Sequence, residues 1–321
     1  MTINYSIIIP HKNTPNLLQR CLDSIPQQNG VEVIVVDDNS DPSLVNFSQF
    51  PGMNRDDVVL LFDKSNKGPG IARNIGIKKA KGKWIIFIDA DDYFNYCIRD
   101  ILLEYIYDDS DVVYFSASSV DSDTYVNTSR SYDFVVLIDN YLQNETEGEL
   151  GLRYVLASPW GKLIKKSLLI NNNIEFPDVQ ICEDVKFSYL IGWYAKKIKA
   201  DKRAICCYTS RAVSRSSVSA ESVYLDKIQV YIERDKFIID HNIPLPYGSF
   251  YTDELMEMEK TKNFVLHDKI MGILNRSGIS PDIIDEMIEA KRTAKRVLNK
   301  RRNPIRRCAH LFKTKLKGLF N

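Results

Sequence analysis

The sequence predicts an α/β fold in which a doubly wound, mostly parallel, Rossmann-like sheet is followed by a helical, basic C-terminal extension. Over the first 120 residues, short and continuously apolar segments alternate with segments of helical apolar spacing. Uninterrupted apolar strands between helices are typical of a parallel sheet that is buried on both faces. From about residue 223 onward, the spacing of apolar residues becomes helical.

Each element has a local signal in the sequence. Apolar runs predict strands over residues 5–10, 31–40, 57–63, 83–92, 111–120 and 202–211. Helical spacing predicts helices over residues 14–28, 68–82 and 181–198. The first helix has Thr14 as a good N-cap residue and Pro15 at its first position, and the third opens at Glu183 or Asp184. The polar segment 214–222 predicts a mobile loop.

Composition excludes several classes of protein. The formal net charge is +1, and 44% of residues are hydrophobic, which suits a globular protein with a sizeable core. No uninterrupted apolar run approaches about 18 residues, so no transmembrane helix is expected. The first residues lack the pattern of a secretory signal, so we expect a cytoplasmic protein with reduced thiols. The six cysteines show no metal-ligand spacing, so no zinc site is expected.

Polar clusters follow three of the predicted strands, at residues 10–13, 37–40 and 89–92. Ligands of open α/β sheets bind outside the carboxyl ends of the strands, where distant segments converge. The third cluster contains Asp89, Asp91 and Asp92. Mg²⁺ and Mn²⁺ take carboxylate oxygens together with substrate phosphates, so this D-x-D pattern is compatible with a metal site. Taken alone, the pattern is a weak signal and favours an acidic turn that caps the following helix.

Three further motifs have a functional and a structural interpretation each. The glycines of segment 66–76 do not form a dinucleotide fingerprint, since its third glycine position is Arg73. Arg73 could reach a phosphate or a base, or lie on the surface. Residues 37–40 could bind a base or ribose, or form an ordinary turn. The acidic pair Glu183-Asp184 could supply a general base or stabilise a helix start.

Together, these motifs resemble glycosyltransferase family 2, the inverting nucleotide-sugar transferases with the GT-A fold. The resemblance is carried, in order, by "SIIIPHKN", "VEVIVVDDNSD", "NKGPGIARNIGIKKAKGKWIIFIDADD", "PWGKLIKKSLL" and "EDVKFSYL". It covers roughly residues 3 to 215. The resemblance implies a glycosyltransferase domain over 1–220, with a nucleotide-sugar half (1–120) and an acceptor half (121–220), and a helical region over 221–321.

The resemblance also implies which residues bind the donor. The nucleotide-sugar-binding positions are Pro10, His11, Lys12, Asn13, Asp38, Asn66, Gly70, Arg73, Asp89, Ala90 and Asp91. Among them, Asp91 and Asp89 would bind Mn²⁺ or Mg²⁺, and Asp92 is an additional candidate. Lys12 stands where the family usually has an aromatic residue that stacks on the base, which leaves the base preference open.

The other implied roles concern catalysis. Asp184 matches the catalytic base, and Glu183 would position the acceptor or the base. The residues implied on the acceptor side are Trp160 and Lys162. Arg211 and Arg215 align less well and would close over the diphosphate. The implied reaction is a metal-assisted single displacement from a nucleotide sugar, most frequently a UDP-sugar in this family, onto a glycan or lipid-linked acceptor in surface-polysaccharide synthesis.

The C-terminal tail has its own prediction. Residues 291–321 contain twelve lysines and arginines and no acidic residue, with an apolar stripe at helical spacing. Such a helix suits an anionic membrane surface, so we expect peripheral attachment to the inner face of the cell membrane. Packing against the protein is the structural alternative. Basic runs also bind nucleic acid, but no nucleic-acid-binding motif accompanies this one, and we expect no such partner. A catalytically silent nucleotide-sugar-binding protein remains the functional alternative. Oligomeric state is not predicted.

Overall fold

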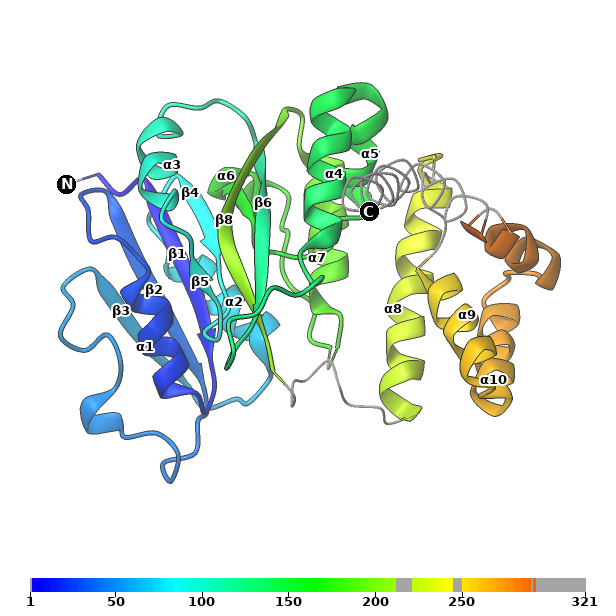
Figure 1. Ribbon diagram of the computed structural model, residues 1–321, viewed down its shortest axis with the longest axis horizontal. Helices are drawn as coiled ribbons and strands as arrows, with labels where there is room; N and C mark the ends of the chain where they lie inside the picture. Colours follow the sequence, from blue (N-terminus) through cyan, green and yellow to red (C-terminus); the bar gives the residue numbers. More distant parts are fainter. Residues whose placement is uncertain (1, 180, 212–220, 245–249, 290, 293–321) are drawn as a thin grey trace, which may run out of the picture. The chain divides into compact units, whose positions relative to one another are not determined.

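A computed structural model describes residues 2–179, 181–211, 221–244, 250–289 and 291–292. The chain folds into two compact units, Met1–Val230 and Tyr231–Asn321. The first unit holds a single eight-stranded sheet, and the described part of the second is helical (Figure 1). The mixed α/β class and the helical C-terminal region predicted from the sequence are confirmed. The assignment of donor and acceptor halves stays a prediction.

The sheet is mostly parallel and has the order β3-β2-β1-β4-β7-β6-β8-β5. Its strands are β1 (Tyr5–His11), β2 (Val31–Asp38), β3 (Val58–Asp63), β4 (Trp84–Phe87), β5 (Tyr93–Phe94), β6 (Val112–Asp121), β7 (Lys162–Lys165) and β8 (Ile198–Ser210). The neighbours β3-β2-β1-β4 are all parallel, as are β6 and β8. Strand β7 is antiparallel to both β4 and β6, and β5 is antiparallel to β8. The sequence did not predict β7.

Helices cover both faces of the parallel half of the sheet. Figure 1 shows α1 (Pro15–Asp23) in front of the sheet and α2 (Pro69–Lys79) behind it. The chain moves in opposite directions along the sheet from β1 to β2 and from β3 to β4, so right-handed crossovers place these helices on opposite faces. A Cβ added at Gly76 would lie 2.4 Å from Cγ2 of Ile8, so glycine lets α2 approach β1 closely.

Between β4 and β8 the described residues form five more α-helices. They are α3 (Ile98–Glu104), α4 (Tyr132–Gln143), α5 (Glu145–Tyr154), α6 (Lys166–Asn171) and α7 (Glu183–Tyr194), and a 3₁₀ helix, Phe47–Gln49, precedes β3. Helix α4 packs on β6 and β8, and α5 packs on α4 and α7. The helical cover holds α7 beside the strands whose carboxyl ends carry the polar clusters.

Three predicted elements are shorter in the structure. The strand expected over 83–92 ends at Phe87, because the chain turns at the aspartates with the Asp92 N–H donating to the Asp89 carbonyl at 3.0 Å. The helix expected over 14–28 ends at Asp23, before Pro26. The helix expected over 181–198 ends at Tyr194, where Ala195 takes an extended conformation.

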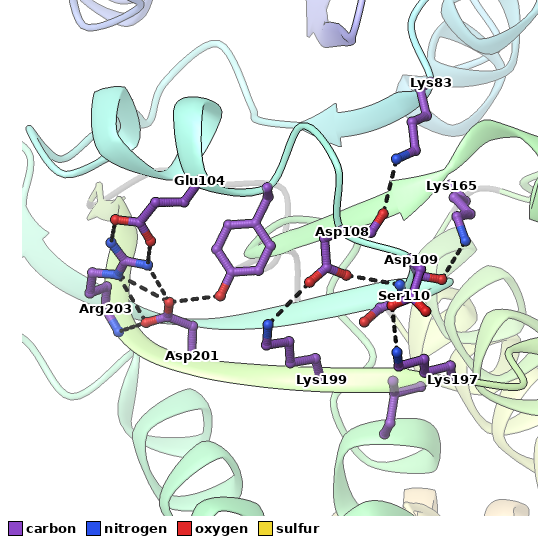
Figure 2. Close-up of polar contacts among 12 residues, drawn as sticks. Lys83, Glu104, Asp108, Asp109, Ser110, Lys165, Lys197, Lys199, Asp201 and Arg203 are labelled. Atoms are coloured by element: carbon purple, nitrogen blue, oxygen red, sulfur yellow. Dashed lines mark hydrogen bonds and ion pairs between the residues drawn. The ribbon is translucent and has the colours of Figure 1, made fainter.

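The end of the sheet opposite the polar clusters is held by charged side chains (Figure 2). Arg203 forms a bidentate pair with Glu104, with Nη1 to Oε1 at 3.0 Å, and also binds Asp201. Lys199 pairs with Asp108 at 3.1 Å, next to the start of β6. Isolated exposed pairs stabilise little, but a bidentate arginine network restrains geometry more effectively. These contacts tie β8 to α3 and to the loop before β6, away from the cleft.

The described C-terminal helices are α8 (Glu221–Asp240), α9 (Tyr251–Thr261) and α10 (Phe264–Arg276), and a further helical segment spans 281–289. Within the second unit, Arg234 pairs with Asp235 at 2.6 Å, and both side chains are buried. None of the helices in the described residues is sufficiently long and apolar to cross a bilayer. The predicted amphipathic tail lies, from residue 293 onward, outside the described residues, as does most of the loop predicted over 214–222.

Candidate active site

A cleft of about 610 Å³ lies at the carboxyl ends of β1, β2, β4 and β8. Its size is in the range of small-molecule sites. The predicted residues that line it are Pro10, His11, Lys12, Asp38, Arg73, Asp89, Ala90, Asp91, Asp92, Trp160, Glu183, Asp184 and Arg211. Four others do not line it: Asn13, Asn66, Gly70 and Lys162. Arg215 lies outside the described residues. The tertiary structure therefore brings together motifs that are up to 200 positions apart.

Three carboxylates meet in the turn after β4. One oxygen each of Asp89, Asp91 and Asp92 lies within 4.8 Å of the others. Burial raises the pKa of Asp91, and the charge of Asp89 raises it further. Burial also raises the pKa of Asp92, with Asp91 and Asp89 adding to the effect. An all-oxygen carboxylate set fits Mg²⁺ or Mn²⁺, and a cation would relieve this repulsion.

The acidic turn is positioned by residues that the sequence did not single out. Thr209, at the end of β8, donates from its N–H to Asp92 at 2.8 Å and from Oγ1 to the Asp91 carbonyl at 2.6 Å. Arg20 of α1 donates to the same carbonyl at 2.5 Å. Arg211 forms an ion pair with Asp91. Arg20 and Thr209 belong to no motif, and only the meeting of α1 with the β8 end gives them this role.

Arg73 connects two acidic groups of the cleft. Its guanidinium pairs with Asp89 at 2.6 Å and with Glu183 at 3.3 Å, and the side chain is 4% exposed. Burial alone would lower the pKa of Arg73, but the charges of Asp89 and Glu183 raise it. The indole N–H of Trp160 donates to the other oxygen of Asp89 at 3.3 Å. Arg73 therefore orients Asp89 in this state, whereas the sequence predicted contact with the donor.

Asp184 lies in the first turn of α7 and lines the cleft. The preceding Cys182 has φ of 58°, a left-handed conformation that turns the chain sharply into the helix. Burial raises the pKa of Asp184 to about 6, and the charge of Glu183 raises it while Arg73 lowers it. A carboxylate with a pKa near 6 is well matched to accept a proton near neutral pH.

Asp38 ends β2 and lines the cleft. Its Oδ2 accepts from the N–H of Gly68 at 3.1 Å and lies 3.6 Å from Nζ of Lys12. Its Oδ1 is buried and has no hydrogen-bond partner in the described part of the chain. An unpaired buried carboxylate oxygen is unfavourable unless a ligand satisfies it. Asp38 is therefore poised to accept an N–H from a bound molecule.

The first loop of the cleft is structurally fixed. The His11 ring is buried, with Nδ1 2.7 Å from Asp37 and Nε2 accepting from the Thr14 N–H at 3.2 Å. Thr14 is the N-cap residue of α1, but its side chain makes no capping hydrogen bond, in contrast to the usual use of threonine there. Asn13 accepts from the N–H of Asp41 at 2.7 Å. The His11 and Asn13 side chains therefore shape the loop, and Lys12 faces the cleft.

Three residues predicted in the site do not line the cleft. Asn66 accepts a hydrogen bond from Lys12. A Cβ at Gly70 would meet Cγ of Glu183 at 3.0 Å, so glycine makes room for the acidic pair. Lys162 is 1% exposed and donates to the carbonyl of Leu156 at 2.8 Å, so it cannot contact an acceptor directly. Lys162 therefore lies outside the cleft lining, and its role in shaping the acceptor side stays a prediction.

Comparisons with known proteins agree with this arrangement. The chain is 26% identical over 253 residues to glycosyltransferase GlyA of Streptococcus pneumoniae, covering 75% of this chain and 35% of that protein. It is 32% identical over 202 residues to the poly(ribitol-phosphate) beta-glucosyltransferase of Bacillus spizizenii, covering 60% of this chain and 30% of that protein. The matches thus span about a third of the length of these two curated relatives.

Solved structures show the same fold. The structure of S. aureus TarS 1-349 in complex with UDP-GlcNAc matches with a TM-score of 0.54 and 24% identity, over 72% of this chain and 66% of that one. The mannosyltransferase PcManGT from Pyrobaculum calidifontis, in complex with GDP-Man and Mn²⁺, matches with a TM-score of 0.51 and 19% identity. The match covers 77% of this chain and 67% of that one. The GT-A fold is confirmed.

The family model named "Glycosyl transferase family 2" matches residues 6–171. The chain therefore belongs to glycosyltransferase family 2.

Proposed function

We propose that this chain is an inverting glycosyltransferase that transfers a sugar from a nucleotide sugar to a glycan or lipid-linked acceptor. The proposed donor is a UDP-sugar. One observation supports this proposal: three features that such a reaction needs line the same cleft. They are the cluster of three carboxylates, an Asp38 oxygen without a hydrogen-bond partner among the described residues, and Asp184, whose pKa is raised to about 6. Uracil offers a single N–H that Asp38 can accept, flanked by carbonyl oxygens. The TarS structures that resemble this fold contain UDP or UDP-GlcNAc.

The proposed reaction is a single displacement. Asp184 accepts the proton of the acceptor hydroxyl as that oxygen forms a bond to the anomeric carbon. The bond from this carbon to the diphosphate oxygen breaks on the opposite face, so the configuration inverts and nucleoside diphosphate leaves. Asp91 and Asp89, with Asp92, would hold Mn²⁺ or Mg²⁺, which when bound neutralises the departing diphosphate. Arg73 and Trp160 keep Asp89 oriented throughout.

We also propose that the two halves of the first unit divide the substrates. Asp38, Asp89 and Asp91 come from residues 1–120, and Trp160 and Asp184 come from residues 121–220. The donor would therefore rest on the first half and the acceptor on the second. Attachment to the inner face of the cell membrane through residues 291–321 is kept as a proposal, and its support is the basic amphipathic sequence alone.

Release of nucleoside diphosphate from UDP-, GDP- and dTDP-sugars, each with Mn²⁺, Mg²⁺ or EDTA, tests this function. We expect turnover of one donor with metal and none with EDTA. Slow hydrolysis without an acceptor is sufficient. If no donor is turned over and none binds in a metal-dependent way, the transferase proposal is wrong, and a regulatory or nucleic-acid-binding role takes its place.

The pH profile provides a separate prediction. Because Asp184 must be ionised to accept a proton and its pKa is raised to about 6, kcat should fall about tenfold per unit below about pH 6 and stay level above it. An exposed aspartate would lose activity only near about pH 4. Donor affinity is measured at each pH as well. Protonation of Asp91 and Asp92 would weaken donor binding, whereas protonation of Asp184 would lower kcat without weakening it. A kcat that stays level down to about pH 5 would contradict the assignment of Asp184.

A further inference from the structure

Lys162, at the start of β7, has a buried side-chain amino group that forms no ion pair with a carboxylate in the described part of the chain. The residue is 1% exposed. Its Nζ lies within hydrogen-bond distance of three neutral acceptors: the carbonyl of Leu156 at 2.8 Å, that of Ser158 at 2.6 Å and Oγ of Ser188 at 3.4 Å.

Such a group is unfavourable for folding. Moving an ammonium ion out of water without an adjacent counter-charge is strongly disfavoured, and here burial lowers the pKa of Lys162 to about 7, with Asp184 partly opposing the shift. A methionine of similar length would avoid this penalty. The lysine must therefore provide something that an apolar side chain does not, which is its set of three hydrogen bonds.

These hydrogen bonds converge on the segment that leads into Trp160. The Ser188 hydroxyl donates to the carbonyl of Ala157, so the carbonyls of residues 156, 157 and 158 are all bound by Lys162 or Ser188. The next residues are Pro159 and Trp160, and the Trp160 indole donates to Asp89. The segment is thus fixed immediately before the side chain that touches the acidic cluster.

The same hydrogen bonds reach the helix that carries the general base. Ser188 and Asp184 are four residues apart on α7 and therefore lie on the same face of that helix. Lys162 contacts Ser188 on one side and the carbonyls of Leu156 and Ser158 on the other. One buried amino group thereby joins β7, the segment before Trp160 and the middle of α7.

We propose that Lys162 is a positioning residue that holds the Trp160 turn against α7, so that Asp89 and Asp184 keep a fixed separation across the cleft. It touches neither substrate, and its effect on turnover rests on the transfer reaction proposed above. In that reaction the donor is held on the Asp89 side and the acceptor hydroxyl on the Asp184 side. A small change in this separation would misalign the two reactants, and misplacement of about 1 Å can reduce turnover about 100-fold.

Lys162→Met removes the three donors while keeping the length of the side chain. The matched control is Lys165→Met, since Lys165 lies on the same strand and its ammonium also binds a backbone carbonyl, that of Asp109 at 2.5 Å, outside the cleft. For Lys162→Met we expect kcat to fall about 10- to 100-fold while the KM and dissociation constant of the donor change less than about threefold. For Lys165→Met we expect no comparable loss of kcat.

A spectroscopic measurement tests the positioning without using activity. The chain has three tryptophans, so protein labelled with 5-fluorotryptophan should give three ¹⁹F signals, and Trp160→Phe identifies that of Trp160. We expect Lys162→Met to shift or broaden the Trp160 signal and Lys165→Met to leave it unchanged. If Lys162→Met does not fold, Ser188→Ala removes the bond to Ala157 and should give a smaller effect of the same kind.

The outcomes are distinct. An unchanged Trp160 signal in the folded Lys162→Met protein, or in Ser188→Ala if that variant must be used, overturns the positioning role. A loss of donor binding equal to the loss of kcat overturns it too, since it indicates a general structural effect. Absence of turnover and donor binding in the wild-type protein counts against the proposed function instead, and the ¹⁹F signals still decide whether Lys162 positions Trp160.

Discussion

Asp184→Asn is expected to lower kcat by about 10²- to 10⁴-fold, the range attributed to general-base catalysis, with donor affinity nearly unchanged. The amide keeps the size of the carboxylate but cannot accept the proton of the acceptor hydroxyl. In the proposed reaction Asp184 contacts the acceptor, whereas the predicted donor ligands Asp38, Asp89 and Asp91 come from other elements. Steady-state kinetics and calorimetric titration with UDP and metal measure the two effects separately.

The same variant should be more stable than the wild type at neutral pH. Because the pKa of Asp184 is raised from 3.8 to about 6 in the folded protein, ionised Asp184 lowers the free energy of unfolding above about pH 6, by at most about 3 kcal/mol. This loss of unfolding free energy becomes smaller as the pH falls. It is absent near about pH 4, where Asp184 is protonated in the folded protein. Thermal unfolding at both pH values checks the sign.

Asp133→Asn is the matched control, because Asp133 also lies in the first turn of a helix, α4, but is exposed and outside the cleft. If Asp184 only stabilised the start of α7, both variants would lose a few tenths of a kcal/mol and retain turnover. Full turnover in folded Asp184→Asn would show that the base is a different residue.

Asp91→Asn is expected to weaken Mn²⁺ binding at least about tenfold and to reduce turnover by about 10³-fold. The substitution removes one anionic oxygen ligand from a cluster of three. It also removes like charge that raises the pKa of Asp92. Free Mn²⁺ measured by electron paramagnetic resonance, with and without UDP, gives the affinity independently of activity.

Asp123→Asn controls for charge alone, since Asp123 is an exposed aspartate in the turn after β6 and does not line the cleft. It should bind Mn²⁺ as the wild type does. Equal Mn²⁺ affinity in Asp91→Asn and the wild type would contradict the assignment of Asp91 as a metal ligand. The nucleic-acid-binding alternative makes the opposite prediction, because it assigns no role to this cluster.

Much of the fold of residues 1–120 was predictable from local sequence. Continuous apolar segments determine β1, β2 and β4, because strands buried on both faces need no polar alternation. The polar residues that follow them must then meet at one edge of a parallel sheet. The family motifs added roles to these residues, and the structure places most of them around one cleft.

The second half was less predictable, because its elements depend on long-range contacts. Strand β7 is only four residues long, and its pairing with β4 and β6 is specified by neighbours far away in the sequence. Arg20 and Thr209 belong to no motif, yet both bind the acidic turn. Lys162 occurs in a recognisable motif, but its burial depends on α7 packing over it.

The sequence by itself determined the class of fold, the acidic turn after β4 and the identity of the residues around it, because apolar pattern and residue type are local properties. Only the tertiary structure decided which charges are paired and how deeply they are buried. Arg73 is held between Asp89 and Glu183, Asp184 has a pKa near 6, and Lys162 lies under the cleft. Those properties depend on desolvation and distance, which exist only once remote segments have packed together.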